Sequence, residues 1–445
     1  MFLHAAHALL DDGFMPDVRI EVAGGDIVAV TPGAAPQSGD EAVGGVVLPG
    51  MPNVHSHAFQ RAFAGLSEFA GGGGDFWSWR EAMYRVADRI SPHGYSAIAA
   101  WLAKELLKGG YTALAEFHYL HHQPNGVHYG DGATLARAVA AGAAQAGMPL
   151  TLLVGVYEAA GFDGAPLVGG QKRFALGVDE AIAMADRLAR DDIVCGLALH
   201  SLRAVAPESL RKAATDFAGR GPIHIHVAEQ RAEVDASIAT LGMPPVAWLL
   251  DNIAINSAWC LVHATHATEQ EIAAVARSNA VIGLCPSTEA DLGDGIFALP
   301  ALLESCGQFG IGSDSNVTLD AFAELRLLEY SQRLRGEARN IASGGNGHTG
   351  RALWQSAARG GARACGRVAG RIAPGHSADF VVIEPTFESA GRAAEFCLDA
   401  AIFAATRPAA RHVMAGGAWL VRDGVHRNEI VIDAGYRRAL ADLAA

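Results

Sequence analysis

The sequence predicts an α/β protein, a (β/α)8 TIM-like barrel with a small β domain assembled from both termini. Short apolar runs alternate with amphipathic segments through the middle of the chain, which is typical of a parallel barrel. Both ends instead carry β-like runs separated by Gly and Pro. The predicted domains are residues 1–48 and 371–445, which form the small β domain and a tail, and residues 49–370, which form the barrel.

The eight predicted barrel strands are apolar runs. They lie at 46–57, 111–117, 150–157, 193–200, 222–228, 259–265, 280–286 and 309–315. The predicted helices lie at 92–108, 133–147, 179–190, 207–218, 269–277 and 319–335. Apolar residues in these helices recur at three- and four-residue spacing, as Ile272, Val275 and Ala276 do, so one face of each helix can pack on the barrel. The β-like runs of the termini include 18–22 and 378–383.

The composition indicates a globular protein that binds neither nucleic acid nor a membrane. Of the 445 residues, 50% are hydrophobic and 18% are charged, which allows a large core. The formal net charge of -13 disfavours non-specific binding to polyanions. The chain has no uncharged apolar run of about 18 residues, and its N-terminus lacks the pattern of a signal peptide. We therefore expect a cytoplasmic protein.

The cysteines are expected to be reduced residues of the core. They are far apart in the sequence, and none belongs to a CxxC pair or to a disulfide framework. The six positions are Cys195, Cys260, Cys285, Cys306, Cys365 and Cys397.

Histidine and aspartate residues end several predicted strands. His55 and His57 are two residues apart, so on a strand their imidazoles point to the same face. His226 ends the fifth run and Asp314 ends the eighth. Carboxyl ends of barrel strands form the face on which active sites are built. Three imidazoles and a carboxylate suit a catalytic zinc or iron, so we predict one divalent metal ion, Zn2+ in preference to Fe2+, at these four residues.

Neighbouring residues narrow the choice of ligands and the number of metal ions. An isolated His-X-His is usually a pair of structural histidines, but here ligand candidates end three different strands. Only one of His224 and His226 need be a ligand, and we favour His226 because Glu229 follows it by three residues. The fourth strand ends at His200 and not at a lysine. A carbamylated lysine that bridges two metals is therefore absent, which favours a single ion.

Other histidines have to be weighed separately. His263 ends the sixth run, next to the fifth, and we predict that it lies within reach of a metal-bound water. His266 lies outside that strand and is expected to be a loop residue. His118, His121 and His122 could hold a second metal, but we favour a packed loop.

The longer motifs around these residues are specific. They are GMPNVHSHAFQRAF (50–63), FWSWRE (76–81), GYTALAEFHYLHH (110–122), HSLRAV (200–205), HIHVAEQ (224–230), CLVHATH (260–266), CPSTEADLGDG (285–295) and GIGSDSN (310–316). Through these motifs the chain resembles the amidohydrolase superfamily, in its mononuclear deaminase branch. Within that branch it is most similar to the formimidoylglutamate deiminase family (N-formimino-L-glutamate iminohydrolases) of histidine degradation. The similarity runs through nearly the whole chain.

This resemblance implies an activity and a set of site residues. The activity is hydrolytic deimination of N-formimino-L-glutamate to N-formyl-L-glutamate and ammonia. The resemblance implies metal ligation by the four residues predicted above, with Glu229, His263 and Asp314 as catalytic groups and a homodimer as the assembly. The substrate-binding residues that it implies are Gln60, Arg80, Tyr119, His200 and Arg203.

The charge of that substrate gives an independent, weaker reason for two of these residues. The substrate carries two carboxylates, and the guanidinium fork of arginine matches a carboxylate in bidentate geometry. Arg203 follows the end of the fourth predicted strand, and Arg80 follows the first. Tyr119 could donate a further hydrogen bond or only cap a strand.

Two alternatives stay open at this stage. One is a deaminase of a nucleobase or a related heterocycle, whose aromatic substrate needs stacking and amide partners in place of two arginines. The other is a non-catalytic scaffold of the same fold. A scaffold is expected to lose its metal ligands, whereas every candidate ligand and both acid–base candidates are present here.

Overall fold

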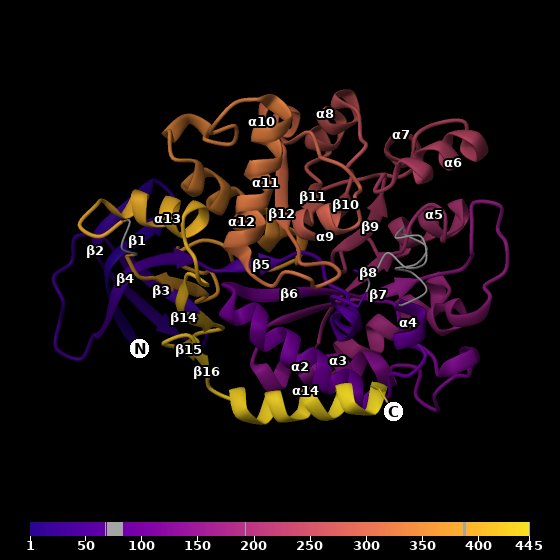
Figure 1. Cartoon of the computed structure of the whole chain (residues 1–445), viewed down its shortest axis with the longest axis horizontal. Helices are drawn as coiled ribbons and strands as arrows, with labels where there is room; N and C mark the ends of the chain where they lie inside the picture. The colour runs from indigo at the N-terminus through magenta and orange to yellow at the C-terminus, as the bar shows by residue number, and fades with distance from the viewer. Residues whose placement is uncertain (67, 69–82, 192, 386–388, 445) are drawn as a thin grey trace.

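The computed structural model describes residues 1–66, 68, 83–191, 193–385 and 389–444. Within these residues two eight-stranded sheets organise the chain (Figure 1). One sheet forms the barrel, surrounded by helices, and the other forms a small domain at one end of the molecule. The predicted fold class is therefore confirmed.

The barrel sheet is parallel, and its strands follow one another in sequence order. Its strands are β5 (Met51–Asn53), β6 (Tyr111–His118), β7 (Leu150–Val156), β8 (Val194–Leu199), β9 (Ile223–Val227), β10 (Trp259–His263), β11 (Val281–Leu284) and β12 (Gln308–Ile311). Almost all their residues are buried, as expected for strands enclosed by helices.

The first predicted strand, 46–57, proves to be two strands in different sheets. Its first half belongs to β4 (Glu41–Pro49) of the small sheet, and only β5 belongs to the barrel. Gly50 separates them, at a point where a Cβ atom would collide with the side chain of Thr112. The uninterrupted apolar run does not reveal the break, because both halves are buried.

The predicted helices are present as α2 (Pro92–Lys108), α3 (Thr134–Ala146), α4 (Val178–Ala189), α5 (Pro207–Asp216), α8 (Glu269–Ser278) and α11 (Ala321–Gly336). The structure adds α6 (Arg231–Leu241), α7 (Pro245–Asn252), α9 (Pro286–Asp291), α10 (Leu299–Glu304) and α12 (Thr349–Ala364). Helices α9 and α10 are too short to show a period of 3.6 residues. Helix α12 contains Gly360, which lowers helix propensity but lets the helix approach Phe309 of β12 closely.

The small sheet joins the two termini of the chain. Its order is β16-β15-β14-β13-β4-β1-β2-β3, and the antiparallel pair β4–β13 connects the N-terminal strands to the C-terminal ones. The remaining strands are β1 (Phe2–Leu10), β2 (Gly13–Ala23), β3 (Asp26–Thr31), β13 (Phe380–Ile383), β14 (Ala410–Ala415), β15 (Ala418–Arg422) and β16 (Val425–His426). We propose the division at residues 48 and 370 as the domain boundaries.

Two helices follow the barrel in the C-terminal part, where β-like runs alone were expected. Helix α13 (Ala394–Phe403) lies between β13 and β14. Helix α14 (Glu429–Ala444) lies along α2 of the barrel (Figure 1), where the Tyr436 ring stacks on that of Trp101 with centroids 4.4 Å apart. The C-terminal tail therefore packs on the helical layer that surrounds the barrel.

Strands β5 and β12 close the barrel, and the contacts between them continue beyond both strands. The amide of Val54 donates to the carbonyl of Ile311 (3.0 Å), that of Asp314 to His55 (2.9 Å), and that of His57 to Asp314 (2.9 Å). A Cβ atom on Gly312 would lie 2.9 Å from the Cβ of His55, so only glycine allows this approach. We call this contact the closing seam.

The six cysteines are all free. Four are buried and Cys195 is partly buried, but Cys306 is exposed, so the prediction of a core position is wrong for Cys306. Cys306 lies in the turn after α10 with a positive φ of 53°. Among the described residues, every helix is too short or too polar to cross a bilayer.

Candidate active site

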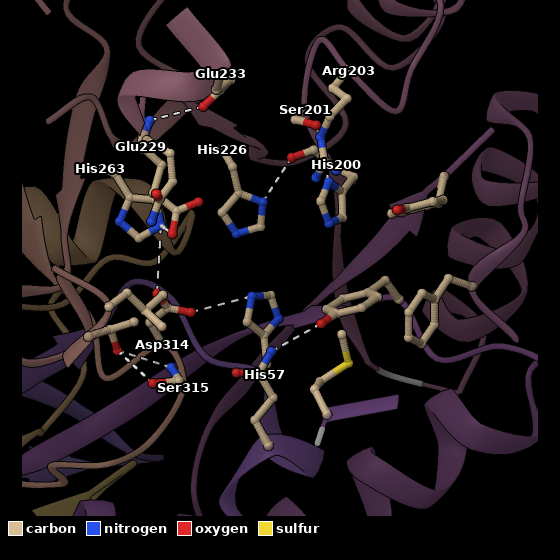
Figure 2. Close-up of a pocket in the computed structure, with 18 of the residues that line it drawn as sticks. His57, His200, Ser201, Arg203, His226, Glu229, Glu233, His263, Asp314 and Ser315 are labelled. Atoms are coloured by element: carbon tan, nitrogen blue, oxygen red, sulfur yellow. Dashed lines mark hydrogen bonds and ion pairs between the residues drawn. The ribbon is translucent and has the colours of Figure 1, made fainter. Parts of the chain in front are cut away.

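A cavity of about 360 Å³ opens at the carboxyl ends of the barrel strands. Figure 2 shows the polar groups around it, which come from segments far apart in the sequence. Of the predicted site residues, the cavity is lined by His57, Gln60, Tyr119, His200, Arg203, His226, Glu229, His263 and Asp314. His55 lies directly behind this lining, buried completely. Arg80 lies outside the described residues.

Three imidazoles converge on one point. The Nε2 atom of His55 lies 3.2 Å from Nε2 of His57 and 3.0 Å from Nε2 of His226. The other ring nitrogens of two of them are engaged, since Nδ1 of His57 donates to the carbonyl of Phe117 (3.0 Å) and Nδ1 of His226 to that of His200 (2.8 Å). These bonds leave the Nε2 lone pairs directed at one another. Such lone pairs repel unless a cation lies between them, so the donor set fits a metal ion.

Asp314 completes this donor set from the other side of the closing seam. Its Oδ1 atom lies 3.4 Å from Nε2 of His55 and 3.4 Å from Nε2 of His57. Burial alone would raise the pKa of Asp314, but His55, His263 and His57 outweigh it and hold the pKa well below its usual range. Burial lowers the pKa of His55 to about 3, and it also lowers the pKa of His57 and His226. Neutral imidazoles and an ionised carboxylate are the forms that bind a metal.

Glu229 and His263 lie beside this group. The Nε2 atom of His263 is 3.6 Å from Oδ2 of Asp314 and 3.7 Å from Oε1 of Glu229. Burial alone would lower the pKa of His263, but Glu229, Glu289 and Asp314 raise it well above its usual value. Burial raises the pKa of Glu229, and His263 offsets part of that effect. The two side chains can therefore hold and exchange a proton next to the candidate metal position.

The predicted substrate-binding residues form the opposite part of the cavity. Gln60 donates from Nε2 to the hydroxyl of Tyr119 (3.0 Å), and Nδ1 of His200 lies 3.2 Å from Oγ of Ser201. Arg203 lines the same cavity, and its positive charge offsets part of the rise in the pKa of Glu229.

Aromatic side chains form the rest of this wall. The Tyr119 ring packs edge-on against Phe174 (4.8 Å between centroids), and Tyr157 packs against His200 (4.6 Å). Tyr84 stacks on Phe174 at 5.9 Å. The cavity thus combines polar groups at the strand ends with an apolar wall, as small-molecule sites commonly do.

Four other histidines that the sequence offered as candidates have partners outside the cavity. His224, on β9 with His226, points away from the cavity and its Nε2 lies 2.8 Å from the carbonyl of Ala364 in α12. Nε2 of His121 lies 2.9 Å from the carbonyl of Gly155, and Nε2 of His122 lies 2.6 Å from that of Ala175. Nδ1 of His118 is 3.5 Å from the hydroxyl of Tyr95.

Glu233, Thr288 and Glu289 were not predicted from the sequence to belong to the site. Glu233 lines the cavity and accepts a hydrogen bond from the amide of Glu229 (3.0 Å), and burial raises its pKa to about 7. Its spacing of four residues from Glu229, across the start of α6, is the signal that could have indicated it. Thr288 and Glu289 contact the loops of Asp314 and His263 respectively. No local pattern distinguishes them from ordinary residues of a helix start.

The chain can be compared with known proteins by sequence and by fold. A model described as "Amidohydrolase family" matches residues 46–420, and one described as "Formimidoylglutamate deiminase HutF, N-terminal domain" matches residues 1–44. The chain belongs to the amidohydrolase family. A structure of an amidohydrolase from Brucella melitensis is similar to this amidohydrolase with a TM-score of 0.93 and 41% identity, covering 100% of both chains.

Two curated relatives differ in the activity that they are named for. This amidohydrolase is 46% identical over 436 residues to a formimidoylglutamate deiminase of Pseudomonas aeruginosa, which covers 96% of each chain. It is 30% identical over 395 residues to an 8-oxoguanine deaminase of the same organism, which covers 85% of this chain and 83% of that protein.

The two histidines of β9 allow a matched test of the metal site. We expect His226→Gln to lower bound divalent metal from about one equivalent per chain to a small fraction, because it removes one of four donors. His224→Gln should keep the metal, because that imidazole faces α12. Elemental analysis of gel-filtered protein measures both, and metal retained by His226→Gln would contradict the assignment.

Proposed function

We propose that this amidohydrolase hydrolyses a carbon–nitrogen bond of N-formimino-L-glutamate, giving N-formyl-L-glutamate and ammonia. The observation that carries the proposal is the 46% identity to a formimidoylglutamate deiminase over nearly the full length of both chains. The match of residues 1–44 to an N-terminal domain of the same kind of enzyme supports it. The acid–base groups and the arginine in the cavity agree with the chemistry required.

We propose that His55, His57, His226 and Asp314 hold one divalent ion, zinc in preference to ferrous iron. The converging Nε2 atoms and the ionised carboxylate are suitable donors for either metal. When bound, a divalent ion acts as a Lewis acid and lowers the pKa of water from about 16 towards 7.

The side chains around this position have distinct parts in the reaction. His263 and Asp314, 3.6 Å apart, orient the attacking water and accept its proton. A C–O bond then forms at the formimino carbon while the double bond to the terminal nitrogen becomes single. Loss of the second proton of the water gives the C=O bond of the product as the remaining bond to that nitrogen breaks. Glu229 carries a proton to that nitrogen, which leaves as ammonia. The raised pKa of Glu229 suits a carboxyl group that has to hold a proton before it donates it.

The substrate carboxylates require cationic or hydrogen-bonding partners. Arg203 supplies a guanidinium at the cavity wall, and Tyr119, Gln60 and His200 supply polar groups beside it. We propose that these residues bind the substrate and that Arg80 binds its second carboxylate. The aromatic wall then packs against the methylene groups of the glutamate moiety.

A second candidate substrate is a nucleobase or a related heterocycle. The observation in its favour is the aromatic wall, in which Tyr84, Phe174 and Tyr157 offer surfaces for a planar ring. The lower identity to the 8-oxoguanine deaminase makes it the weaker candidate.

We further propose that the enzyme is a homodimer and that it is cytoplasmic. Gel filtration with light scattering tests the homodimer, and cell fractionation tests the location.

Ammonia release by the metal-loaded enzyme tests the substrate directly. We expect rapid turnover of N-formimino-L-glutamate and little or no turnover of guanine, 8-oxoguanine, cytosine or adenosine. Formiminoglycine, which has one carboxylate, should show a much higher KM. Turnover of a nucleobase in place of the formimino compounds would favour the second candidate.

Replacement of Glu229 by Gln should abolish its proton transfer. We expect kcat to fall by about 100-fold or more, while the metal content and the secondary structure stay as in the wild type. Glu208→Gln on exposed α5 is the matched control and should keep wild-type activity. A Glu229→Gln variant with near-normal kcat would exclude the residue from the proton path.

Replacement of Arg203 by Met should weaken substrate binding. Because the carboxylate contact is shared by the ground state and the transition state, KM should rise by about 10-fold or more with a smaller change in kcat. Arg211→Met is the control, since Arg211 pairs with Asn252 on the surface, outside the cavity lining. Steady-state kinetics on both variants measure these changes. An unchanged KM in Arg203→Met would contradict a role of Arg203 in substrate binding.

A further inference from the structure

The short helix α9 follows β11, the strand between the strands that lead to His263 and Asp314. Three consecutive side chains of α9, those of Ser287, Thr288 and Glu289, are buried. Each contacts a different segment of the chain. Buried polar side chains need partners, so these contacts fix where the helix lies.

Glu289 contacts His263. Its Oε1 atom lies 3.2 Å from Nδ1 of His263 and accepts a hydrogen bond from the amide of Cys285 (2.9 Å). Because this oxygen is already an acceptor, Nδ1 of His263 is the donor and carries the hydrogen. Nε2 then faces the cavity, towards Asp314 and Glu229. Glu289 is 5% exposed and is absent from the cavity lining, so it does not reach the substrate.

The backbone at His263 has an uncommon conformation. His263 and Ala264 have φ values of 68° and 50°, in the left-handed region that non-glycine residues rarely adopt. Such conformations cost about 1–3 kcal/mol each and persist where surrounding contacts over-determine them. The bond to Glu289 is such a contact.

The rest of α9 is tied to two other segments. Ser287 donates from its amide to Oε2 of Glu324 in α11 (2.9 Å). Thr288 Oγ1 accepts from the amide of Ser315 (3.2 Å) and lies 3.0 Å from the Ser315 hydroxyl, next to Asp314. Helix α9 is thus fixed to α11 and to the Asp314 loop. These contacts hold Glu289 in the position from which it contacts His263.

We propose that Glu289 is a positioning residue for the reaction, which holds His263 with Nδ1–H outward and Nε2 facing the attacked carbon. The bond acts through ring orientation and tautomer, as carboxylates behind catalytic and metal-bound histidines do. This role rests on the proposed hydrolysis, in which His263 acts on the attacking water.

A metal site is the competing interpretation of the same cluster. His263, Cys285 and Glu289 bring one donor atom each within 4.8 Å of one another. Two observations favour positioning. Oε1 of Glu289 already accepts from the Cys285 amide and contacts His263, and burial raises the pKa of the Cys285 thiol well above its usual value, so it stays protonated.

The test is a double-mutant cycle between Glu289 and His263. In the wild-type background, Glu289→Gln should lower kcat by about 10- to 100-fold and leave KM within about twofold, since no substrate contact is lost. In the His263→Asn background the same substitution should change the remaining kcat by less than about twofold, because its partner is gone. Glu289→Asp keeps the charge but shortens the reach, and should show the same kcat loss if Glu289→Gln does not fold.

Glu329→Gln is the matched control for loss of a buried carboxylate. Glu329 accepts from the amides of Ile341 and Ala342 far from the cavity, so its replacement should lower Tm and leave kcat within about twofold. Equal kcat losses from Glu289→Gln in both backgrounds, or a rise in KM alone, would overturn the proposal. So would loss of a second equivalent of metal from Glu289→Gln.

The cycle runs on whichever substrate the wild-type enzyme turns over. If N-formimino-L-glutamate is not that substrate, the proposed function fails while the coupling between Glu289 and His263 is still measured.

Discussion

The closing seam between β5 and β12 is the constraint on which the site depends. Strand β5 is only three residues long, so His55 and His57 lie beyond it, and their backbone position comes from hydrogen bonds to Asp314 across the seam. The same bonds place the Asp314 carboxylate beside the two imidazoles. Because side chains alternate along extended chain, a shift of one residue would turn both histidines away from the barrel mouth.

Burial gives this group its electrostatic character. Removing an imidazole from water favours its neutral form, and removing a carboxylate favours its protonated form, unless a neighbour of opposite charge compensates. Asp314 has such neighbours and stays ionised, whereas Glu229 is only partly compensated and its pKa rises. Two carboxyl groups close to the same histidine therefore differ in their readiness to hold a proton. In the proposed mechanism, that difference suits Asp314 to be a metal ligand and Glu229 to hold the proton that it gives to the leaving nitrogen.

Much of the fold could be predicted, because strands and helices of a barrel leave local patterns. Six of the eight barrel strands lie within the predicted runs, and β6 and β12 each extend one residue beyond theirs. The failures have physical causes: the run 46–57 is apolar on both sides of Gly50, α9 and α10 are shorter than two helical turns, and Cys306 occupies an exposed turn. Composition and periodicity indicate which residues are buried and whether a segment is a helix or a strand. They do not indicate where a continuous apolar run passes from one sheet to another.

The sequence by itself indicated the candidate metal ligands and His263, because each lies at or just after the end of a predicted strand and strand ends of a parallel barrel meet on one face. The acid–base roles of Glu229 and His263 came from the family resemblance. Only the tertiary structure decided that His224 faces α12 while His226 faces the cavity. It also decided that Glu289 supports His263 and that Thr288 supports the Asp314 loop. These contacts join residues about 25 or more positions apart through the packing of separate strands and helices, and no local pattern encodes such a pairing.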